Sequence, residues 1–284
     1  MRILVTGSKG QLGSQFKEIS RLYKDMKFFF ATRHEVDITK LKVVEKAIKD
    51  GDIDCIINCA SFTGVDNAEE NFQDAMDVNA VGVRNLALAS AKTKTFLVHF
   101  STDYLFDGQK SVPYTEDDIP DPKTAYGKSK LAGEKEIFLN LERGLILRTS
   151  WLYSAFGNNF VKTILNKCKE KQDLKVVYDQ VGSPTYAYDF AHATLTILPK
   201  IFKMPEGISV YNYSNEGVAS WYDIAIAIAD IKKLQCKIEP VLSNHFPSKA
   251  ERPHYSLLNK EKIKNDFNLN IPHWRRSLNR CLKK

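Results

Sequence analysis

The chain has 284 residues, of which 43% are hydrophobic, and a net charge of +7. This length supports one large α/β unit or two closely joined domains, and no run of about 18 apolar residues predicts a membrane span. The opening "MRILVTGSKG" leads directly into an expected strand and turn, unlike a secretory signal.

The net charge and the cysteines indicate which partners and which compartment to expect. The lysines are spread along the chain without a basic–aromatic motif, so we expect no nucleic-acid partner. A nucleotide cofactor and a phosphorylated substrate explain the positive net charge equally well. The cysteines are scattered and odd in number, and they form no zinc-like cluster with histidine. They are Cys55, Cys59, Cys168, Cys236 and Cys281. We expect Cys55 and Cys59 to be reduced and buried, and the protein to be cytoplasmic.

Residues 2–6 predict a buried parallel strand, and "GSKGQLG" with the helical spacing of 14–20 predicts a turn into a helix. Gly7 permits a tight turn, Gly10 lets a pyrophosphate approach the backbone, and Gly13 lets helix and strand pack closely. The helix N-terminus offers free N–H groups to phosphates. The pattern favours a dinucleotide-binding turn over an ordinary strand-to-helix turn.

The second strand, within "MKFFFATRHEVDIT", lacks the acidic residue that usually binds the ribose 2′-hydroxyl of NAD. Arg33 stands nearby, and an arginine suits a 2′-phosphate. We therefore expect NADPH, with NADH possible; the alternative is that Arg33 is a solvated loop charge. Asp37 and Ile38 are expected to flank the adenine.

Residues 55–59 predict a third buried strand, which runs into the small residues Ala60 and Ser61. Small side chains there allow a dinucleotide to lie across the strand ends. Residues 75–91 have the spacing of a helix in which Asn79 is polar. Asn79 either braces the site or satisfies a local backbone group, and the sequence leaves these two interpretations evenly balanced.

A fourth strand over 96–100 ends in Ser101-Thr102-Asp103-Tyr104, where ligands of doubly wound sheets bind. Further on, "TAYGKSKLAGEKE" places Tyr126 and Lys130 on one face of a helix. A cation about 4 Å from the phenol could lower its pKa from about 10 by up to about three units. Tyr23 and Lys27 have the same spacing but no strand-end crevice beside them, so we interpret them as solvated.

Together these motifs resemble the extended short-chain dehydrogenase/reductase family, which is marked by T-G-x-x-G-x-x-G (here Thr6 to Gly13), a strand-end Thr102, and Y-x-x-x-K (Tyr126 and Lys130). Within it, the chain is most similar to the dTDP-4-dehydrorhamnose reductase family. The resemblance spans residues 7 to 259. The stretches that carry it are "GSKGQLG", "INCASFTGVDNAEE", "FSTDYLFDG", "PYTEDDIPDPKTAYGKSKLAGE", "LRTSWLYSAFGNNFVKTIL", "DQVGSPTYAYDFA" and "AERPHYSLLN".

The resemblance implies that NADPH reduces the C4 keto group of dTDP-4-dehydro-β-L-rhamnose. Tyr126 would protonate the oxygen, Lys130 would tune Tyr126 and bind the nicotinamide ribose, and Thr102 would hold the carbonyl. Asp103 and Tyr104 would lie beside the sugar, and Trp151 against it. The residues expected to bind the cofactor are Gly7, Gly10, Gln11, Leu12, Gly13, Arg33, Asp37, Ile38, Ser61, Phe62, Thr63, Tyr126 and Lys130.

Two further positions concern the substrate diphosphate and a metal ion. Arg252 is a candidate for the diphosphate because a guanidinium binds phosphate in a fork, and a surface charge is the alternative. Some relatives bind Mg²⁺ between subunits through an acidic residue just after the third glycine. Ser14 and Gln15 stand there in this chain, so we predict no metal and not that dimer. Monomer and homodimer both remain open.

We expect an α/β fold, a doubly wound parallel sheet of the Rossmann type with a smaller C-terminal α/β domain. Residues 1–150, with 175–198 returning to them, would bind the cofactor; 151–174 and 199–284 would bind the nucleotide-sugar. Residues 180–185 are expected to line the cleft, and Trp221 to serve in packing. The histidines are interpreted as structural or exposed.

Two other functions remain. The first is a reductase or epimerase of another nucleotide-activated 4-keto sugar, which would differ only in pocket shape. The second is a non-catalytic role like that of the regulatory subunit of methionine adenosyltransferase, which resembles the same reductases. The intact set of Thr102, Tyr126 and Lys130 favours an enzyme.

Overall fold

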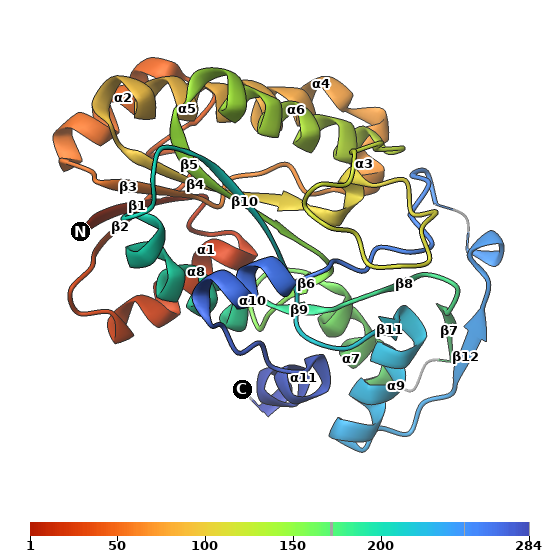
Figure 1. The fold of residues 1–284 in the computed structure, drawn as a ribbon. Coiled ribbons are helices and arrows are strands. Elements are labelled where there is room, and N and C mark those ends of the chain that lie inside the picture. The colour runs from red at the N-terminus through yellow and green to blue at the C-terminus, as the bar shows by residue number, and fades with distance from the viewer. Residues whose placement is uncertain (171–172, 247, 284) are drawn as a thin grey trace.

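The computed structural model describes residues 1–170, 173–246 and 248–283, and a six-stranded parallel sheet lies at its centre (Figure 1). The strands lie in the order β10-β5-β4-β3-β1-β2. They are β1 Arg2–Thr6, β2 Lys27–Phe30, β3 Cys55–Asn58, β4 Phe96–Thr102, β5 Arg143–Thr149 and β10 Gly207–Tyr213. Every residue of β3 and β4 is buried, as expected of parallel strands covered on both faces.

Helices cover both faces of this sheet. Figure 1 shows α2, α5 and α6 above it and α1 and α8 below it. Their bounds are α1 Gln11–Ile19, α2 Leu41–Gly51, α5 Gly82–Thr93, α6 Ala125–Asn140 and α8 Ala187–Ile201. Apolar side chains fill both layers, with Leu86 and Ile56 in one and Phe16 and Phe190 in the other. The predicted fold class is confirmed.

A smaller unit with its own apolar core lies at the C-terminal end of the sheet strands. Its helices are α7 Phe160–Lys169, α9 Trp221–Lys232 and α11 Trp274–Lys283. Its strands pair as β6 Leu152–Tyr153 with β9 Thr185–Tyr186, β7 Leu174–Val177 with β12 Ile238–Val241, and β8 Val181–Gly182 with β11 Ala219–Ser220. A capping box starts α9, because Ser220 and Asp223 each accept a hydrogen bond from the other's backbone N–H.

The remaining elements are short. α3 Val65–Glu70 and α4 Phe72–Met76 follow β3, and α10 Glu261–Phe267 packs against β10. Residues Asp77–Val81 form a π-helical turn that leads into α5. Single 3-10 turns lie at Ser20–Leu22, Asp103–Leu105 and Ser243–His245.

One segment differs from the expected division of the chain. We predicted 199–284 to belong to the smaller domain, but β10 pairs in parallel with β5 and forms the edge of the large sheet. The sequence did not indicate this because strands that pair in parallel sheets need not be neighbours along the chain. The helix α8, which precedes β10, packs against α1.

The cysteines also differ in part from expectation. Cys168 of α7 and Cys236, which precedes β12, form a disulfide across 68 residues of sequence. Cys55 is fully buried and Cys59 partly buried, and both are thiols. Across the described ranges, none of the helices has the length and apolar character needed to cross a bilayer.

Candidate active site

The turn between β1 and α1 has the geometry of a phosphate cradle. Gly7 has φ of +61°, and a Cβ at this position would lie 2.6 Å from the backbone nitrogen of Ala60, so only glycine fits. The N–H of Gly10 donates to the Gly7 carbonyl at 2.9 Å, and no side chain caps the start of α1. The first N–H groups of α1 are therefore available to an anionic ligand.

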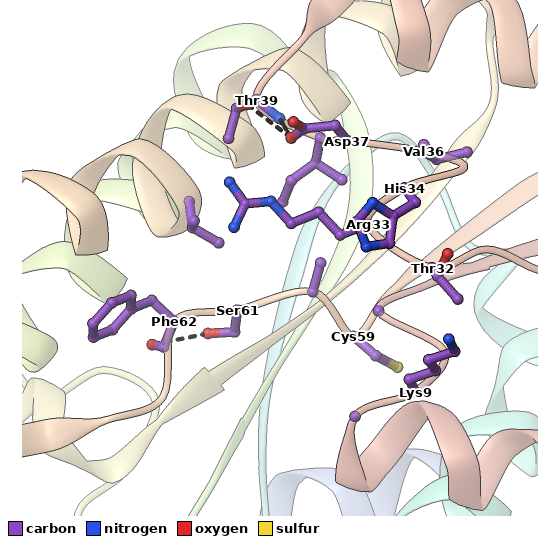
Figure 2. A pocket seen from close by; sticks show the side chains of 15 residues that line it. Lys9, Thr32, Arg33, His34, Val36, Asp37, Thr39, Cys59, Ser61 and Phe62 are labelled. Atoms are coloured by element: carbon purple, nitrogen blue, oxygen red, sulfur yellow. Dashed lines mark hydrogen bonds between the residues drawn. The ribbon is translucent and has the colours of Figure 1, made fainter. Parts of the chain in front are cut away.

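A cavity of about 430 Å³ opens beside this turn, at the exit of β2 (Figure 2). Figure 2 shows the Arg33 side chain extending into the cavity, with His34 beside it and Lys9 on the opposite wall. Asp37 accepts hydrogen bonds from the N–H and hydroxyl of Thr39, at 3.1 and 2.7 Å. The cavity thus offers two basic side chains and a histidine to whatever group enters it.

The loop after β3 forms the floor between this cavity and the next, and Asn79 holds it. The Asn79 Oδ1 accepts from the Ser61 hydroxyl at 2.8 Å and from the Phe62 N–H at 2.9 Å. Its Nδ2 donates to the Phe62 carbonyl at 2.9 Å and to the Ser129 hydroxyl of α6 at 3.0 Å. Of the two interpretations left open by the sequence, Asn79 is the brace.

A second cavity of about 630 Å³ lies between the sheet and the smaller unit, and the predicted catalytic residues Thr102, Tyr126 and Lys130 all line it. Thr102 ends β4 and its hydroxyl donates to Asp103 Oδ1 at 3.1 Å. Tyr126 lies in the first turn of α6, which Thr124 caps by accepting from the Gly127 N–H at 3.0 Å. The cap fixes where the helix starts, and hence where Tyr126 points.

α6 approaches the strand-end turn very closely. A Cβ on Gly127 would lie 2.2 Å from the carbonyl oxygen of Tyr104. The rings of Tyr104 and Tyr126 then meet edge to face with centroids 5.6 Å apart. The glycine that follows Tyr126 is therefore what allows the phenol to reach the end of β4.

Burial changes the acidities of both members of the pair. Burial raises the pKa of Tyr126 to about 12, and the hydrogen bond with the Thr102 hydroxyl partly offsets this. The pKa of Tyr126 is thus raised in the protein alone, because loss of solvent dominates. That the Lys130 charge tunes Tyr126 stays a prediction. Burial also lowers the pKa of Lys130 to about 8. A phenol that stays protonated at neutral pH suits a proton donor.

Asp103 is a buried carboxyl at the floor of the same cavity, with 2% of its surface exposed. Its Oδ2 makes no close hydrogen bond among the described residues. Burial raises the pKa of Asp103 to about 6, and the Ser256 hydroxyl nearby partly offsets this. A buried carboxyl with so few hydrogen bonds, in a residue that lines the cavity, is a candidate contact for a ligand hydroxyl.

An aromatic wall closes the other side of the cavity. The indoles of Trp151 and Trp221 stack with centroids 3.7 Å apart and planes 8° apart, and Phe160 packs against Trp221. Trp151 has φ of +47°, which is rare for a bulky residue. Trp221, which we interpreted as packing, both packs and lines the cavity; its Nε1 donates to Gln180 at 3.1 Å.

The remaining predicted residues are placed as follows. Arg252 pairs with Asp66 and lines a small adjoining cavity of about 70 Å³, which shares Tyr104 with the large one. The other expected ligand residues, except Gly13, line the cavity beside the phosphate turn or the cavity that holds the predicted catalytic residues: Gly7, Gly10, Gln11, Leu12, Arg33, Asp37, Ile38, Ser61, Phe62, Thr63, Asp103, Tyr104 and Trp151. Gly13 lies in the first turn of α1, against the Gly7 carbonyl.

Several other expectations concern positions outside the catalytic group. Gln15 is fully buried and donates to Glu18, so its side chain does not face solvent. Of 180–185, Pro184 lines the large cavity. Tyr23 lies outside the cavity beside the phosphate turn and the cavity of the predicted catalytic residues, as expected. It is not simply solvated, however: its ring packs partly buried against the core, and its hydroxyl donates to the His192 carbonyl at 3.2 Å.

Sequence reasoning missed some lining residues. Lys9 and His34 flank motifs that we read for their glycines and arginine alone, and "GNNF" contributes Asn159, whose Nδ2 donates to Gln11 at 2.7 Å. That bond ties the smaller unit to the phosphate turn. The polar pair in "GNNF" was the available signal, but its partner lies 148 residues away.

A parallel sheet with a glycine turn after its first strand, together with a strand-end threonine and a Tyr-x-x-x-Lys pair in one cavity, defines the class of extended short-chain dehydrogenases/reductases. Residues 1–284 match the family described as RmlD substrate binding domain. The chain belongs to this family.

Three relatives illustrate the similarity. The chain is 39% identical over 284 residues to the spore coat polysaccharide biosynthesis protein SpsK of Bacillus subtilis (strain 168), covering 99% of this chain and 97% of that protein. It is 38% identical over 288 residues to dTDP-4-dehydrorhamnose reductase of Aggregatibacter actinomycetemcomitans, covering 98% and 97%. The crystal structure of dTDP-4-dehydrorhamnose reductase from Bacillus anthracis in complex with NADP superposes with a TM-score of 0.93, at 35% identity and 99% and 98% coverage.

Proposed function

We propose that the protein reduces the C4 keto group of dTDP-4-dehydro-β-L-rhamnose to give dTDP-L-rhamnose, with NADPH as the reductant. The observation that carries the proposal is the meeting of Thr102, Tyr126 and Lys130 in one cavity that continues to the phosphate turn. The reductases that share 33–38% of their residues with nearly the whole chain support the same reaction.

Bound NADPH supplies the hydride, and the protein supplies position and a proton. The Tyr126 phenol, kept protonated by its raised pKa, gives its proton to the sugar oxygen as charge develops there. The Thr102 hydroxyl, whose single proton points to Asp103 Oδ1 in the protein alone, turns to donate to the same oxygen. The Lys130 Nζ, which donates to the Phe100 carbonyl at 2.6 Å, is anchored to hold the nicotinamide ribose.

The residues present fit an NADP-type dinucleotide. The cradle at Gly7, which a Cβ would fill, accepts the pyrophosphate. Arg33, Lys9 and His34 line the adjoining cavity and suit a 2′-phosphate, and the Asp37 carboxylate that lines it too accepts hydrogen bonds from Thr39 (Figure 2). NADH binds more weakly in this proposal because it leaves these groups unpaired.

The sugar and its diphosphate occupy the far part of the large cavity. Trp151 packs against the sugar ring, and Asp103 and Tyr104 bind its hydroxyl groups. The Oδ2 of Asp103, which makes no close hydrogen bond within the described part of the chain, supports this assignment. Arg252 meets the diphosphate from the adjoining cavity, exchanging part of its pairing with Asp66 for the ligand.

The division of labour follows from these positions. Residues 1–150 and 175–198 bind the cofactor, together with β10 of the large sheet, and the remainder of 151–284 binds the nucleotide-sugar. The reaction needs one chain, since all the named groups come from it, so a monomer or a homodimer serves equally. We propose a cytoplasmic location, which the thiols Cys55 and Cys59 support and against which the Cys168–Cys236 disulfide weighs.

Absorbance at 340 nm tests the proposal directly. The keto sugar is generated in place from dTDP-glucose by the upstream dehydratase and epimerase, and NADPH is added with the protein. We expect oxidation of NADPH that requires the epimerase. If protein that binds NADPH oxidises none, the assignment fails, and other nucleotide-activated 4-keto sugars become the next substrates to assay.

A further inference from the structure

A row of buried polar side chains crosses three neighbouring strands and ends at Lys130. Thr6 of β1 pairs with Asn58 of β3, and Asn58 pairs with His99 of β4. All three side chains, and Lys130 itself, are at least 98% buried. The row lies under the active-site cavity, which Asn58 and Lys130 line. Neither the reaction nor the cofactor site described above uses His99.

The backbone fixes which way Asn58 points. The Asn58 Oδ1 accepts from the Thr6 hydroxyl at 2.7 Å and from the Ala60 N–H at 3.2 Å. Since a backbone N–H can only donate, the amide oxygen must lie on that side, and Nδ2 faces His99 Nδ1 at 3.1 Å. His99 Nδ1 therefore accepts, and the neutral ring carries its proton on Nε2.

That proton points at Lys130. His99 Nε2 lies 3.3 Å from Lys130 Nζ, which also donates to the Phe100 carbonyl. An ammonium group has three donors and no lone pair. If Lys130 were charged, one of its N–H groups would therefore face the N–H of His99. A neutral amine instead accepts from the ring N–H and still donates to Phe100. Every group in the row is satisfied only when Lys130 has lost a proton.

Other charged groups near Lys130 do not remove this conflict. Glu134, one turn along α6, favours the charged form of Lys130, but both its oxygens bind Arg148, at 3.1 and 2.8 Å. Asp103 and Tyr126 line the same cavity, and burial disfavours the charged form of each. His99 is buried and its pKa lies well below its usual value, so the ring stays neutral.

We propose that Asn58 holds His99 in its Nε2–H form and that His99 is thereby a positioning residue that makes Lys130 release its proton readily. This inference rests on the proposed function in one respect. It predicts that turnover has an alkaline limit. Turnover falls as Lys130 becomes neutral, and the Asn58–His99 pair sets the pH at which this happens.

The tautomer can be read without turnover. We would label the histidines of the full chain with ¹⁵N and record long-range proton–nitrogen spectra from pH 6 to 10, assigning His99 by the signal lost in His99→Gln. The expected result is the Nε2–H tautomer throughout. An Nδ1–H tautomer or an imidazolium at position 99 would overturn the proposal. The tautomer is read in the unaltered protein, and the variant serves only to assign the signal; correlation of the ring with the His99 backbone assigns it if His99→Gln fails to fold.

Asn58→Asp reverses the arrangement, because a carboxylate at position 58 accepts from Nδ1–H and leaves Nε2 free to accept from an ammonium. We expect His99 to change to the Nδ1–H form and the alkaline limb of kcat to move up by about one pH unit or more. Thr6→Val is the matched control: it removes one buried hydrogen bond of the row, but the Ala60 N–H still orients Asn58, so tautomer and limb stay.

The proposal is contradicted if the alkaline limb of the kcat profile does not move in Asn58→Asp. It is also contradicted if the limb moves by the same amount in Thr6→Val. The proposed reductase function and the proposed role of His99 can fail independently of each other. A protein without reductase activity that shows the Nε2–H tautomer contradicts the proposed function and supports the role of His99 in the row. A reductase whose His99 is in the Nδ1–H form does the opposite.

Discussion

Tyr126 and Lys130 lie one turn apart on α6, and burial makes each keep its uncharged form more readily than it would in water. The phenol holds its proton more firmly and the amine holds it less firmly. Tyr126 therefore stays uncharged until it gives its proton to the substrate, which happens only after the cofactor and the substrate have bound. The spacing indicated the pair, but only the surroundings decide the direction of each pKa change.

Tyr126→Phe tests the proton donor. We expect kcat to fall by about 10²- to 10⁴-fold, the usual worth of a positioned acid, with little change in thermal stability because the ring remains. Tyr23→Phe is the matched control, since Tyr23 has the same spacing to Lys27 but lies outside the cavities. Stopped-flow or steady-state absorbance measures both. Activity within tenfold of the unaltered protein in Tyr126→Phe would contradict the role.

Arg33→Ala and Lys9→Ala test the recognition of the 2′-phosphate. Each removes a charge-assisted contact worth about 1.5–3 kcal/mol, so kcat/KM with NADPH should fall about tenfold or more, while kcat/KM with NADH changes little. Arg275→Ala on α11 is the control for the loss of one surface charge. Equal losses with both cofactors would show that these side chains do not read the phosphate.

The buried carboxyl of Asp103 lowers the stability of the folded protein when it is ionised, and replacing it should reveal this cost. Its pKa is raised from 3.8 to about 6 in the folded protein, so its contribution to stability is fully present below about pH 4 and is lost as pH rises through 6. About two pKa units correspond to at most about 3 kcal/mol. We therefore expect Asp103→Asn to raise the unfolding free energy at pH 8 and not at pH 4, in parallel urea titrations. A difference that does not depend on pH would contradict the account.

At the scale of elements, the strands and turns with a local signature were predictable. The Gly7 turn and the start of α6 are encoded within a few residues of themselves, by glycine and by the Thr124 cap. The π-helical turn at Asp77–Val81 was not predictable, because its polar residue serves a loop 17 residues away. The stacking of Trp151 on Trp221 was missed for the same reason, since 70 residues separate them.

Asn79→Ala tests that brace. It removes hydrogen bonds to both sides of the loop at Ser61 and Phe62, so we expect the protein to lose about 1–3 kcal/mol of stability and to bind NADPH more weakly. Asn71→Ala, which removes an exposed amide bonded to the Asn67 carbonyl, is the control. Calorimetry of folding and of cofactor binding reads both effects. Unchanged cofactor affinity in Asn79→Ala would mean that the loop is held by other contacts.

At the scale of the whole molecule, the sheet supplies the strand ends and the smaller unit supplies the facing wall. Gln11 and Asn159 join the two across the phosphate turn. The layered fold followed from alternating apolar runs and helical spacing. The placement of β10 at the edge of the large sheet did not, because the strand comes after α8 and pairs with β5, more than 60 residues earlier in the chain. Long-range pairing of this kind leaves no mark within the strand itself.

Deuterium transfer tests the central claim most directly. With NADPH carrying deuterium at both hydrogen positions of nicotinamide C4 and the keto sugar made in place, we expect dTDP-L-rhamnose with one deuterium, bound to C4 of the sugar. Mass spectrometry counts the deuterium and proton NMR locates it. A product without deuterium, or with deuterium at another carbon, would contradict the assignment of this cavity as the site of hydride transfer to C4.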